Sequence, residues 1–170
     1  MKPALFIDRD GTLNIDCPYC NSGKNTIMYD DIFMSLKELS KKYYIIIVTN
    51  QSGVGKGIIT MDQLEEVNNK VKTMIERKGG RVDVIYYCPH TQEDECKCRK
   101  PKTYMLDLAF RDFDIDKEDS FVIGDDDKDM IMARNAGIKG IKIRRKGKEN
   151  GDYFAEDFYI ILDIINRLRY

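Results

Sequence analysis

Five short apolar runs, rich in β-branched and aromatic residues, alternate along the chain with longer segments of helical periodicity. The runs cover residues 4–7, 43–49, 82–88, 121–124 and 140–143. Because they are apolar at successive positions, we expect strands that are covered on both faces, as the strands of a parallel sheet are. The repeated alternation of strand and helix predicts an α/β fold, a doubly wound parallel sheet with right-handed crossovers.

The segments between these runs carry one apolar face at helical spacing, as at residues 32–39 and 64–75. A last, nearly continuously apolar helix is expected at about residues 157–168. Two stretches depart from the pattern: an insert at about residues 16–30 and a polar loop that begins at residue 88. Neither suggests a second core, so we expect a single domain over residues 1–170.

The net charge of the chain limits the classes of molecule that we expect it to bind. The 170 residues carry 28 basic and 29 acidic side chains, a formal charge of −1, which creates no global field for nucleic acid or an anionic membrane. The apolar stretches are far shorter than the roughly 20 residues of a membrane span, and we expect no targeting segment. We therefore expect a cytoplasmic monomer that binds neither nucleic acid nor membrane, with its five cysteines reduced.

Two carboxylates, Asp8 and Asp10, directly follow the first predicted strand. Carboxylates two positions apart at a strand end can point into one crevice, where they repel each other unless a cation balances them. A hard divalent cation with oxygen ligands suits this pair, and Mg²⁺ is the expected one. One carboxylate would serve as nucleophile and the other as general acid/base. The alternative is a turn whose Asp residues cap the loop.

Polar and acidic residues also follow two further strands. The segment Thr49-Asn50-Gln51-Ser52-Gly53 offers hydroxyl, amide and backbone N–H donors for a phosphate. The next residues are not a P-loop, because the Walker pattern needs Ser or Thr at the position that Gly57 occupies. After the fourth strand, Asp125 and Asp129 lie one helical turn apart and add carboxylates to the same crevice.

The loop at residues 88–98, hereafter the zinc loop, has the ligands of a closed zinc site. Cys88, His90, Cys96 and Cys98 supply three thiolates and one imidazole, and such a tetrahedral set leaves no open position for water. We therefore expect a structural zinc that orders the loop, with scattered reduced cysteines as the alternative. Lys100 follows at once, and a fixed lysine beside a metal and two carboxylates would stabilise a transferring phosphoryl group.

As a set, these motifs resemble a known family. Asp8-Arg9-Asp10-Gly11-Thr12-Leu13, Thr49-Asn50-Gln51, Lys100, and Gly124-Asp125 with Asp129 resemble the four motifs of haloacid dehalogenase superfamily phosphatases. The zinc loop with Arg99-Lys100-Pro101 resembles the zinc-loop branch of that superfamily, which contains heptose bisphosphate and histidinol-phosphate phosphatases. The resemblance implies a Rossmann-like fold without a large cap domain, and a phosphomonoester hydrolase with catalytic Mg²⁺ and structural Zn²⁺.

The resemblance also implies a role for each motif residue. Asp8 would attack the phosphoryl group and form a phosphoaspartyl enzyme, and Asp10 would protonate the leaving alkoxide and then activate the hydrolytic water. Thr49 and Lys100 would hold the phosphoryl oxygens. Mg²⁺ would be bound by Asp8, the carbonyl oxygen of Asp10, and Asp125.

The same resemblance implies supporting residues around these. Asp129 would orient Lys100 or the metal ligands. The rest of the substrate would contact Asn50, Gln51, Ser52 and Arg99. Zinc would be bound by Cys88, His90, Cys96 and Cys98.

The resemblance leaves several small phosphorylated substrates open. The Thr49–Gly53 motif and the short chain favour a sugar phosphate such as D-glycero-D-manno-heptose 1,7-bisphosphate, whereas the five residues between His90 and Cys96 are closer to the histidinol-phosphate type. A nucleic-acid 3′-phosphatase shares only the first two motifs, and a non-catalytic zinc module would not need the catalytic residues. Cys17 and Cys20 have CxxC spacing; we expect reduced cysteines near the pocket, with a second metal site as the alternative.

Overall fold

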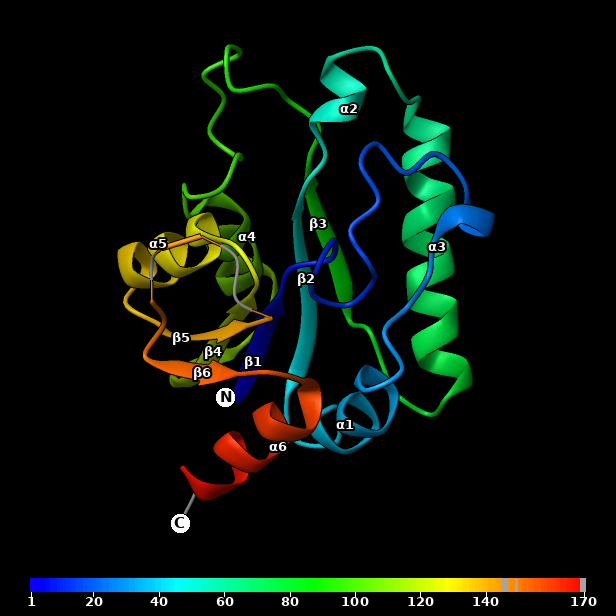
Figure 1. Cartoon of the computed structure of the whole chain (residues 1–170). Helices are drawn as coiled ribbons and strands as arrows, with labels where there is room; N and C mark the ends of the chain where they lie inside the picture. Colours follow the sequence, from blue (N-terminus) through cyan, green and yellow to red (C-terminus); the bar gives the residue numbers. More distant parts are fainter. Residues whose placement is uncertain (145–146, 149, 169–170) are drawn as a thin grey trace.

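Six parallel strands form one sheet in the order β3-β2-β1-β4-β5-β6 (Figure 1). The computed structural model describes residues 1–144, 147–148 and 150–168. The strands are β1 (Lys2–Ile7), β2 (Tyr44–Asn50), β3 (Val84–Cys88), β4 (Ile115–Gly124), β5 (Lys139–Ile143) and β6 (Tyr153–Ala155). The helices are η1 (Gly23–Asn25), α1 (Ile32–Leu39), α2 (Ser52–Gly55), α3 (Met61–Arg77), α4 (Tyr104–Asp112), α5 (Asp127–Ala136) and α6 (Phe158–Arg167).

Helices cover both faces of the sheet, so the predicted doubly wound α/β fold is confirmed. Along β1, Leu5 and Ile7 belong to one buried apolar cluster, and Ala4 and Phe6 belong to the other. The first cluster includes side chains of α1, α3 and α6, and the second includes side chains of α4 and α5. Because successive residues of a strand point to opposite faces, a strand covered on both sides must be apolar throughout.

The chain reverses its direction across the sheet beside β1. It runs from β1 to β2 and β3 on one side, then crosses to β4 on the other side of β1. The loops that follow β1 and β4 therefore diverge and leave a crevice at the carboxyl ends of these strands, where ligands bind in folds of this kind.

Capping residues mark the start of α3 and both ends of α5. The Thr60 hydroxyl accepts a hydrogen bond from the Gln63 N–H at 3.1 Å, and the Gln63 side chain accepts one from the Thr60 N–H, a capping box at the start of α3. Helix α5 begins with a second capping box, formed by Asp126 and Asp129, so one site carboxylate also caps a helix. Gly137, in a left-handed conformation, ends α5.

One additional strand and an earlier start of β4 distinguish the sheet from the one expected. Strand β6 was not predicted, because three residues are too short to show a period, and it forms by pairing with β5 in the register Ile141↔Tyr153. Strand β4 begins at Ile115, ahead of the apolar run at 121–124, with exposed polar residues between. None of the described helices combines the length and the apolar character needed to cross a bilayer.

Removing one buried ring of α6 should destabilise the fold much more than removing its exposed neighbour. Phe158 is fully buried in the core, whereas Tyr159 is 48% exposed. We expect Phe158→Ala to lower the free energy of unfolding by about 3–5 kcal/mol through the cavity it leaves, and Tyr159→Ala by about 0.5 kcal/mol or less. Urea unfolding followed by circular dichroism measures both; equal losses would contradict the packing of α6 on the sheet.

Candidate active site

A buried lysine lies between two buried carboxylates at the carboxyl ends of the central strands. The Lys100 Nζ atom donates to Asp8 Oδ1 at 2.7 Å and to Asp129 Oδ1 at 2.7 Å, and to the backbone carbonyl of Val48 at 2.9 Å. Asp8 directly follows β1, and its N–H donates to the carbonyl of Ile123 in β4. Lys100 reaches this position from the segment that follows the zinc loop, so four separate parts of the chain meet here.

Three buried carboxylates lie close together in this cluster. Carboxylate oxygens of Asp8, Asp125 and Asp129 lie within 4.8 Å of one another. Lys100 forms ion pairs with two of them, Asp8 and Asp129. Three hard oxygen ligands at this separation fit a divalent cation such as Mg²⁺.

The pKa values of the lysine and its partner follow from the same surroundings. Burial lowers the pKa of Lys100, but the negative charges of Asp129 and Asp8 outweigh burial and raise it above its ordinary value. Lys100 therefore keeps its charge at neutral pH. Burial raises the pKa of Asp129 to about 6; the charge of Lys100 opposes this rise, and that of Asp8 adds to it.

Two glycines allow the carboxylates to come this close. Gly11 has φ +80°, and a Cβ atom there would lie 2.3 Å from Asp125 Oδ2. A Cβ atom at Gly124 would lie 2.4 Å from Asp129 Cγ. Any larger residue at either position would displace a carboxylate of the cluster.

Asp10 is held by a separate group of donors. Its carboxylate accepts hydrogen bonds from Arg9 Nε at 3.1 Å, Asn14 Nδ2 at 2.9 Å and Gln51 Nε2 at 2.9 Å. Burial raises the pKa of Asp10, but the charge and hydrogen bonds of Arg9, with those of Asn14 and Gln51, outweigh burial and lower it below the ordinary value. Asp10 is thus a carboxylate at neutral pH, the form that can accept a proton.

The turn after β2 forms a wall of the pocket beside Asp10. Gln51 Nε2 donates to the Thr49 hydroxyl at 2.9 Å as well as to Asp10. Asn50 accepts from the Lys100 N–H at 2.9 Å and donates to the Lys100 carbonyl at 3.2 Å, so it holds the backbone of the lysine on both sides. The expected substrate contact Asn50 is therefore also a positioning residue for Lys100.

The described residues enclose a cavity of about 180 Å³ at this point. Its lining comes from three strand ends and from the insert, and consists of Asp8, Asp10, Asp16, Cys17, Pro18, Tyr19, Thr49, Asn50, Gln51, Ser52, Gly53, Asp125, Asp126 and Lys128. Arg99 lies instead in a neighbouring depression with Thr91 and Lys102, and Lys128 lines both hollows. The structure thus separates Arg99 from the expected substrate contacts Asn50, Gln51 and Ser52.

Several residues that shape this pocket are not among the site residues expected from the sequence. Arg9 is fully buried and also donates to Asn68 Oδ1 of α3 at 2.7 Å, which anchors the Asp10 loop to that helix. The signal that could have indicated a role for Arg9 was its place between the motif residues Asp8 and Asp10. Tyr19 lies in the insert, whose loop residues show no periodicity from which side-chain direction can be inferred. Lys128 is the second residue of α5, and no sequence pattern indicated that its side chain faces the pocket.

The four predicted zinc ligands converge at the end of β3. Cys88 Sγ lies 3.6 Å from His90 Nδ1 and 3.5 Å from Cys96 Sγ, and the Cys96 and Cys98 sulfurs are 3.7 Å apart. Thiolates on a tetrahedral zinc are about 3.8 Å apart, given Zn–S bonds of about 2.3 Å. The donor set and these three distances suit zinc coordination, and the group could hold a metal.

The structure contradicts the expectation that all five cysteines are reduced. Cys17 pairs with Cys20, and Cys88 pairs with Cys98, while Cys96 is free. Each loop brings the paired Cα atoms to 5.2 and 5.4 Å, a separation that a disulfide spans. For Cys88 and Cys98 the same convergence serves a metal, and the two uses exclude each other, because only thiolates bind zinc.

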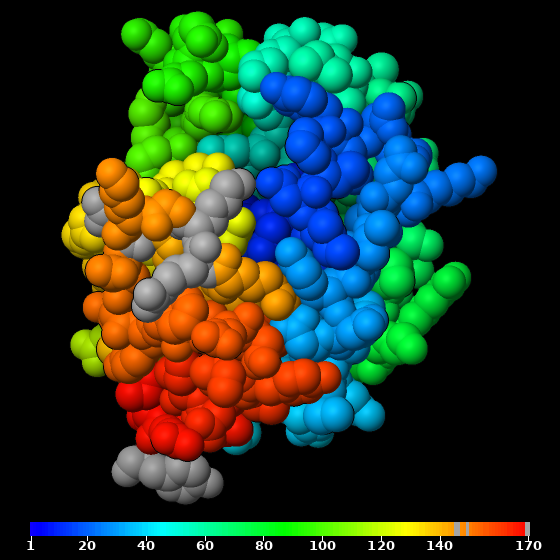
Figure 2. Space-filling model, in the orientation of Figure 1, coloured from blue at the N-terminus to red at the C-terminus, as the bar shows by residue number. Residues whose placement is uncertain are grey.

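The zinc loop is joined to the pocket wall by backbone hydrogen bonds. The Gln51 N–H donates to the Cys88 carbonyl at 2.7 Å, and the Gly55 N–H donates to the Pro89 carbonyl at 2.8 Å. A Cβ atom at Gly55 would lie 2.8 Å from that oxygen, so only glycine allows the approach. In Figure 2 the zinc loop (green) and the insert (blue) flank this part of the surface.

Comparisons with known proteins agree with this geometry. A family model described as HAD-hyrolase-like matches residues 97–161. A probable D-glycero-D-manno-heptose-1,7-bisphosphate 7-phosphatase of Thermoplasma acidophilum is 44% identical over 79% of this chain and 85% of its own length. A D-glycero-beta-D-manno-heptose-1,7-bisphosphate 7-phosphatase of Pasteurella multocida is 35% identical over 99% of this chain and 100% of its own length.

A solved structure extends the likeness to three dimensions. The D,D-heptose 1,7-bisphosphate phosphatase of B. bronchiseptica, complexed with magnesium and phosphate, superimposes with a TM-score of 0.89 at 26% identity, over 99% of both chains. The resemblance inferred from the motifs is thereby confirmed. With a buried Asp–Lys–Asp cluster at the expected strand ends and relatives of this identity along nearly its whole length, the chain belongs to the heptose-bisphosphate phosphatase family of HAD-like hydrolases, and it is a phosphatase.

Proposed function

We propose that this phosphatase hydrolyses a sugar phosphate, D-glycero-D-manno-heptose 1,7-bisphosphate, through a phosphoaspartyl intermediate on Asp8. The observation that carries the proposal is the Lys100 ammonium, held 2.7 Å from Asp8 Oδ1, because Asp8 lines the same cavity as Asp10 and Thr49. A nucleophilic carboxylate, a fixed cation and a second carboxylate are the groups that transfer of a phosphoryl group to and from an enzyme requires.

The steps of this reaction would be carried out by Asp8, Asp10, Thr49 and Lys100. Asp8 attacks the phosphorus, while Lys100 and the Thr49 hydroxyl hold the phosphoryl oxygens and stabilise the charge of the transition state. Asp10, held by Arg9, gives its proton to the leaving sugar alkoxide and later takes one from the hydrolytic water. A carboxylate donates a proton only after taking one up, and the negative charge of a bound phosphate favours that uptake by raising the pKa of Asp10.

The proposed mechanism includes a catalytic Mg²⁺. Mg²⁺ bound by Asp8, Asp125 and the Asp10 carbonyl oxygen would offset the negative charge of the phosphoryl oxygens. The closeness of the Asp8, Asp125 and Asp129 carboxylate oxygens, within 4.8 Å of one another, supports a divalent cation at this position. Asp129 accepts a hydrogen bond from Lys100, which supports its role in orienting the lysine.

The substrate and the nucleophile are tested together by phosphate release. With Mg²⁺ present, we expect heptose 1,7-bisphosphate to exceed histidinol phosphate and a 3′-phosphorylated oligonucleotide by about 100-fold in kcat/KM, or about 2.7 kcal/mol of transition-state binding. Asp8→Asn should lower turnover by about 10³-fold or more, whereas Asp30→Asn, an exposed control, should not. Equal hydrolysis of all three compounds would refute the substrate, and an active Asp8→Asn enzyme would refute the nucleophile.

Replacing the buried lysine should lower kcat without unfolding the enzyme in Mg²⁺. We expect Lys100→Met to reduce kcat by about 10²–10³-fold, because the transition state loses a preorganised cation. Lys42→Met, at an exposed lysine in the turn after α1, is the matched control. Steady-state kinetics and circular dichroism measure the two effects; a reduction of less than tenfold in a folded Lys100→Met enzyme would remove this lysine from the mechanism.

We propose zinc as the occupant of the zinc loop. The Cys88, His90, Cys96 and Cys98 side chains form a set of four ligands with no open position, so the metal would be structural. Its effect on catalysis would be indirect, because the loop leads into Lys100 and is bonded to the Gln51 turn.

The metal content distinguishes zinc from a disulfide in this loop. We expect about one zinc per chain, lost in Cys96→Ser together with thermal stability, because zinc binding supplies folding free energy. Lys97→Ser, an exposed position between two ligands, should keep the metal. Atomic emission and thermal melting provide both measurements. A folded, zinc-free protein with a Cys88–Cys98 disulfide would contradict the proposal.

A further inference from the structure

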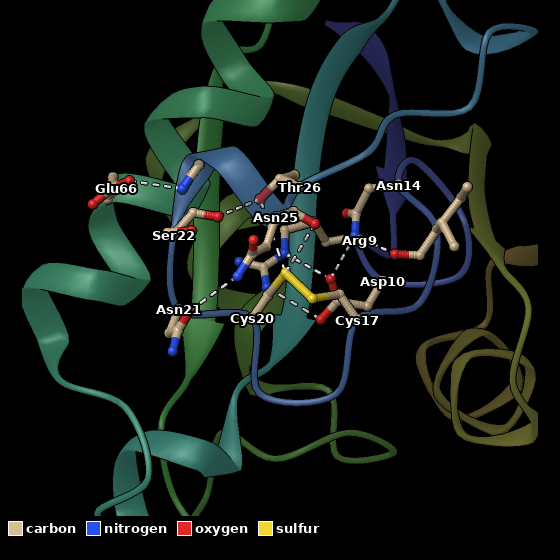
Figure 3. Close-up of a disulfide and its surroundings, with 12 residues drawn as sticks. Arg9, Asp10, Asn14, Cys17, Cys20, Asn21, Ser22, Asn25, Thr26 and Glu66 are labelled. Carbon is tan, nitrogen blue, oxygen red and sulfur yellow. Dashed lines mark hydrogen bonds and ion pairs between the residues drawn. A yellow bond between two sulfur atoms is a disulfide. The ribbon is translucent and has the colours of Figure 1, made fainter.

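The insert brings a pair of cysteines into the wall of the phosphatase pocket. Cys17 and Cys20 form a disulfide across a tight turn, with the Cys20 N–H donating to the Cys17 carbonyl at 3.0 Å (Figure 3). Cys17, Pro18 and Tyr19 all line the cavity that contains Asp8. None of the roles assigned so far uses this pair.

Hydrogen bonds hold the base of the insert independently of the disulfide. The Ile15 N–H donates to the Ile27 carbonyl at 2.8 Å, and the Tyr29 N–H donates to the Leu13 carbonyl at 3.0 Å. At η1, the Gly23 N–H donates to Glu66 Oε1 of α3 at 2.7 Å, a contact that Figure 3 shows beside the disulfide. The disulfide therefore constrains only the tip of the insert, residues 17–20.

The tip contacts the opposite wall of the pocket. Tyr19 has φ +53°, a conformation that non-glycine residues seldom adopt, and its ring packs on Gly53, where a Cβ atom would lie 2.8 Å from Tyr19 Cδ1. The Tyr19 hydroxyl accepts a hydrogen bond from Lys56 Nζ at 2.9 Å. Closing the Cys17–Cys20 turn thus holds Tyr19 against the segment that follows Gln51.

The sulfur atoms of Cys17 and Cys20 differ in how accessible they are to an external thiol. Cys17 is half-buried and faces the cavity, whereas Cys20 is 2% exposed, with its Sγ 3.7 Å from the Asn25 carbonyl and 4.0 Å from the Thr26 hydroxyl. An external thiolate can therefore reach one sulfur only. Thiol–disulfide exchange depends on such access, and a pair with one accessible and one protected sulfur reacts in a defined order.

We propose that Cys17 and Cys20 are a redox modification site, which interconverts between disulfide and dithiol and thereby controls how the pocket binds the part of the substrate beyond the phosphoryl group. The reaction partner is a low-molecular-weight thiol of the glutathione class. The effect on phosphate release rests on the proposed function; the redox chemistry of the pair does not.

The exchange balances without any further reactant. A thiolate of the small thiol attacks Cys17 Sγ, the bond to Cys20 breaks, and Cys20 leaves as a thiolate. A second small thiolate attacks the outer sulfur of the mixed disulfide and releases Cys17. Two small thiols thus lose two electrons and two protons and become one disulfide, and the pair gains two electrons and two protons. Oxidation is the reverse.

Reduction should loosen the tip and leave the catalytic cluster in place. Lys100, Asp8 and Asp129 make no contact with the tip among the hydrogen bonds described for them. The dithiol form should therefore keep its kcat and bind substrate less tightly, the pattern expected when an interaction common to the ground state and the transition state is lost.

Thiol trapping tests the redox pair independently of catalysis. The zinc-loaded protein is equilibrated in buffers of varied reduced-to-oxidised glutathione ratio, alkylated, and mapped by peptide mass spectrometry. We expect residues 17 and 20 to change together from dithiol to disulfide across the series, and Cys20→Ser to hold glutathione as a mixed disulfide on Cys17. A pair that stays in one state over the whole series overturns the proposal.

Hydrogen exchange and kinetics test the control of the pocket. Reduction should increase amide exchange at residues 16–20 and 53–57, leave residues 8–12 unchanged, and raise KM by about threefold or more at constant kcat. The Cys17→Ser/Cys20→Ser variant should match the reduced enzyme and be insensitive to glutathione. Identical exchange and a KM within about twofold in both states would overturn the proposal. Absence of phosphate release in both states, with the exchange difference intact, would overturn the proposed function alone.

Discussion

The buried ammonium of Lys100 is the contact on which the rest of the site depends. It joins Asp8 after β1 to Asp129 in α5, and its own backbone is held by Asn50 after β2. A buried ion pair costs much free energy to form, because the charges lose their hydration, and breaking it by removing one partner costs about 3–5 kcal/mol. The carboxyl ends of three strands therefore have to meet in one arrangement if the lysine is to be paired.

The loops at the carboxyl edge of the sheet support one another. The zinc loop is bonded to the turn after β2 through the Cys88 and Pro89 carbonyls. The insert reaches the same turn from the other side, where Lys56 donates to the Tyr19 hydroxyl. The turn at 51–57 thus lies between two walls, one crosslinked by a metal or a disulfide and the other by a disulfide, and the shape of the substrate pocket follows from both.

Much of this arrangement could be predicted from local patterns. The five apolar runs correspond to β1 to β5, and the motif residues Asp8, Thr49, Lys100 and Asp125 lie at strand ends or in loops around one crevice. Their approach is predictable because parallel strands end at the same edge of a sheet. The pattern does not reveal β6, the burial of Arg9 against Asn68, or the position of Arg99 outside the main cavity.

The fold class and the candidate catalytic and metal-binding residues follow from the amino-acid sequence alone, since periodicity and motif spacing are local properties of the chain. Which loop residues face the pocket and how the cysteines pair follow from the tertiary structure. The bond between Gly23 and Glu66 links residues 43 positions apart, and that between Lys100 and Asp8 links residues 92 positions apart. Such contacts depend on the register of the strands and on the closure of the loops between them. No single local segment of the chain encodes either property.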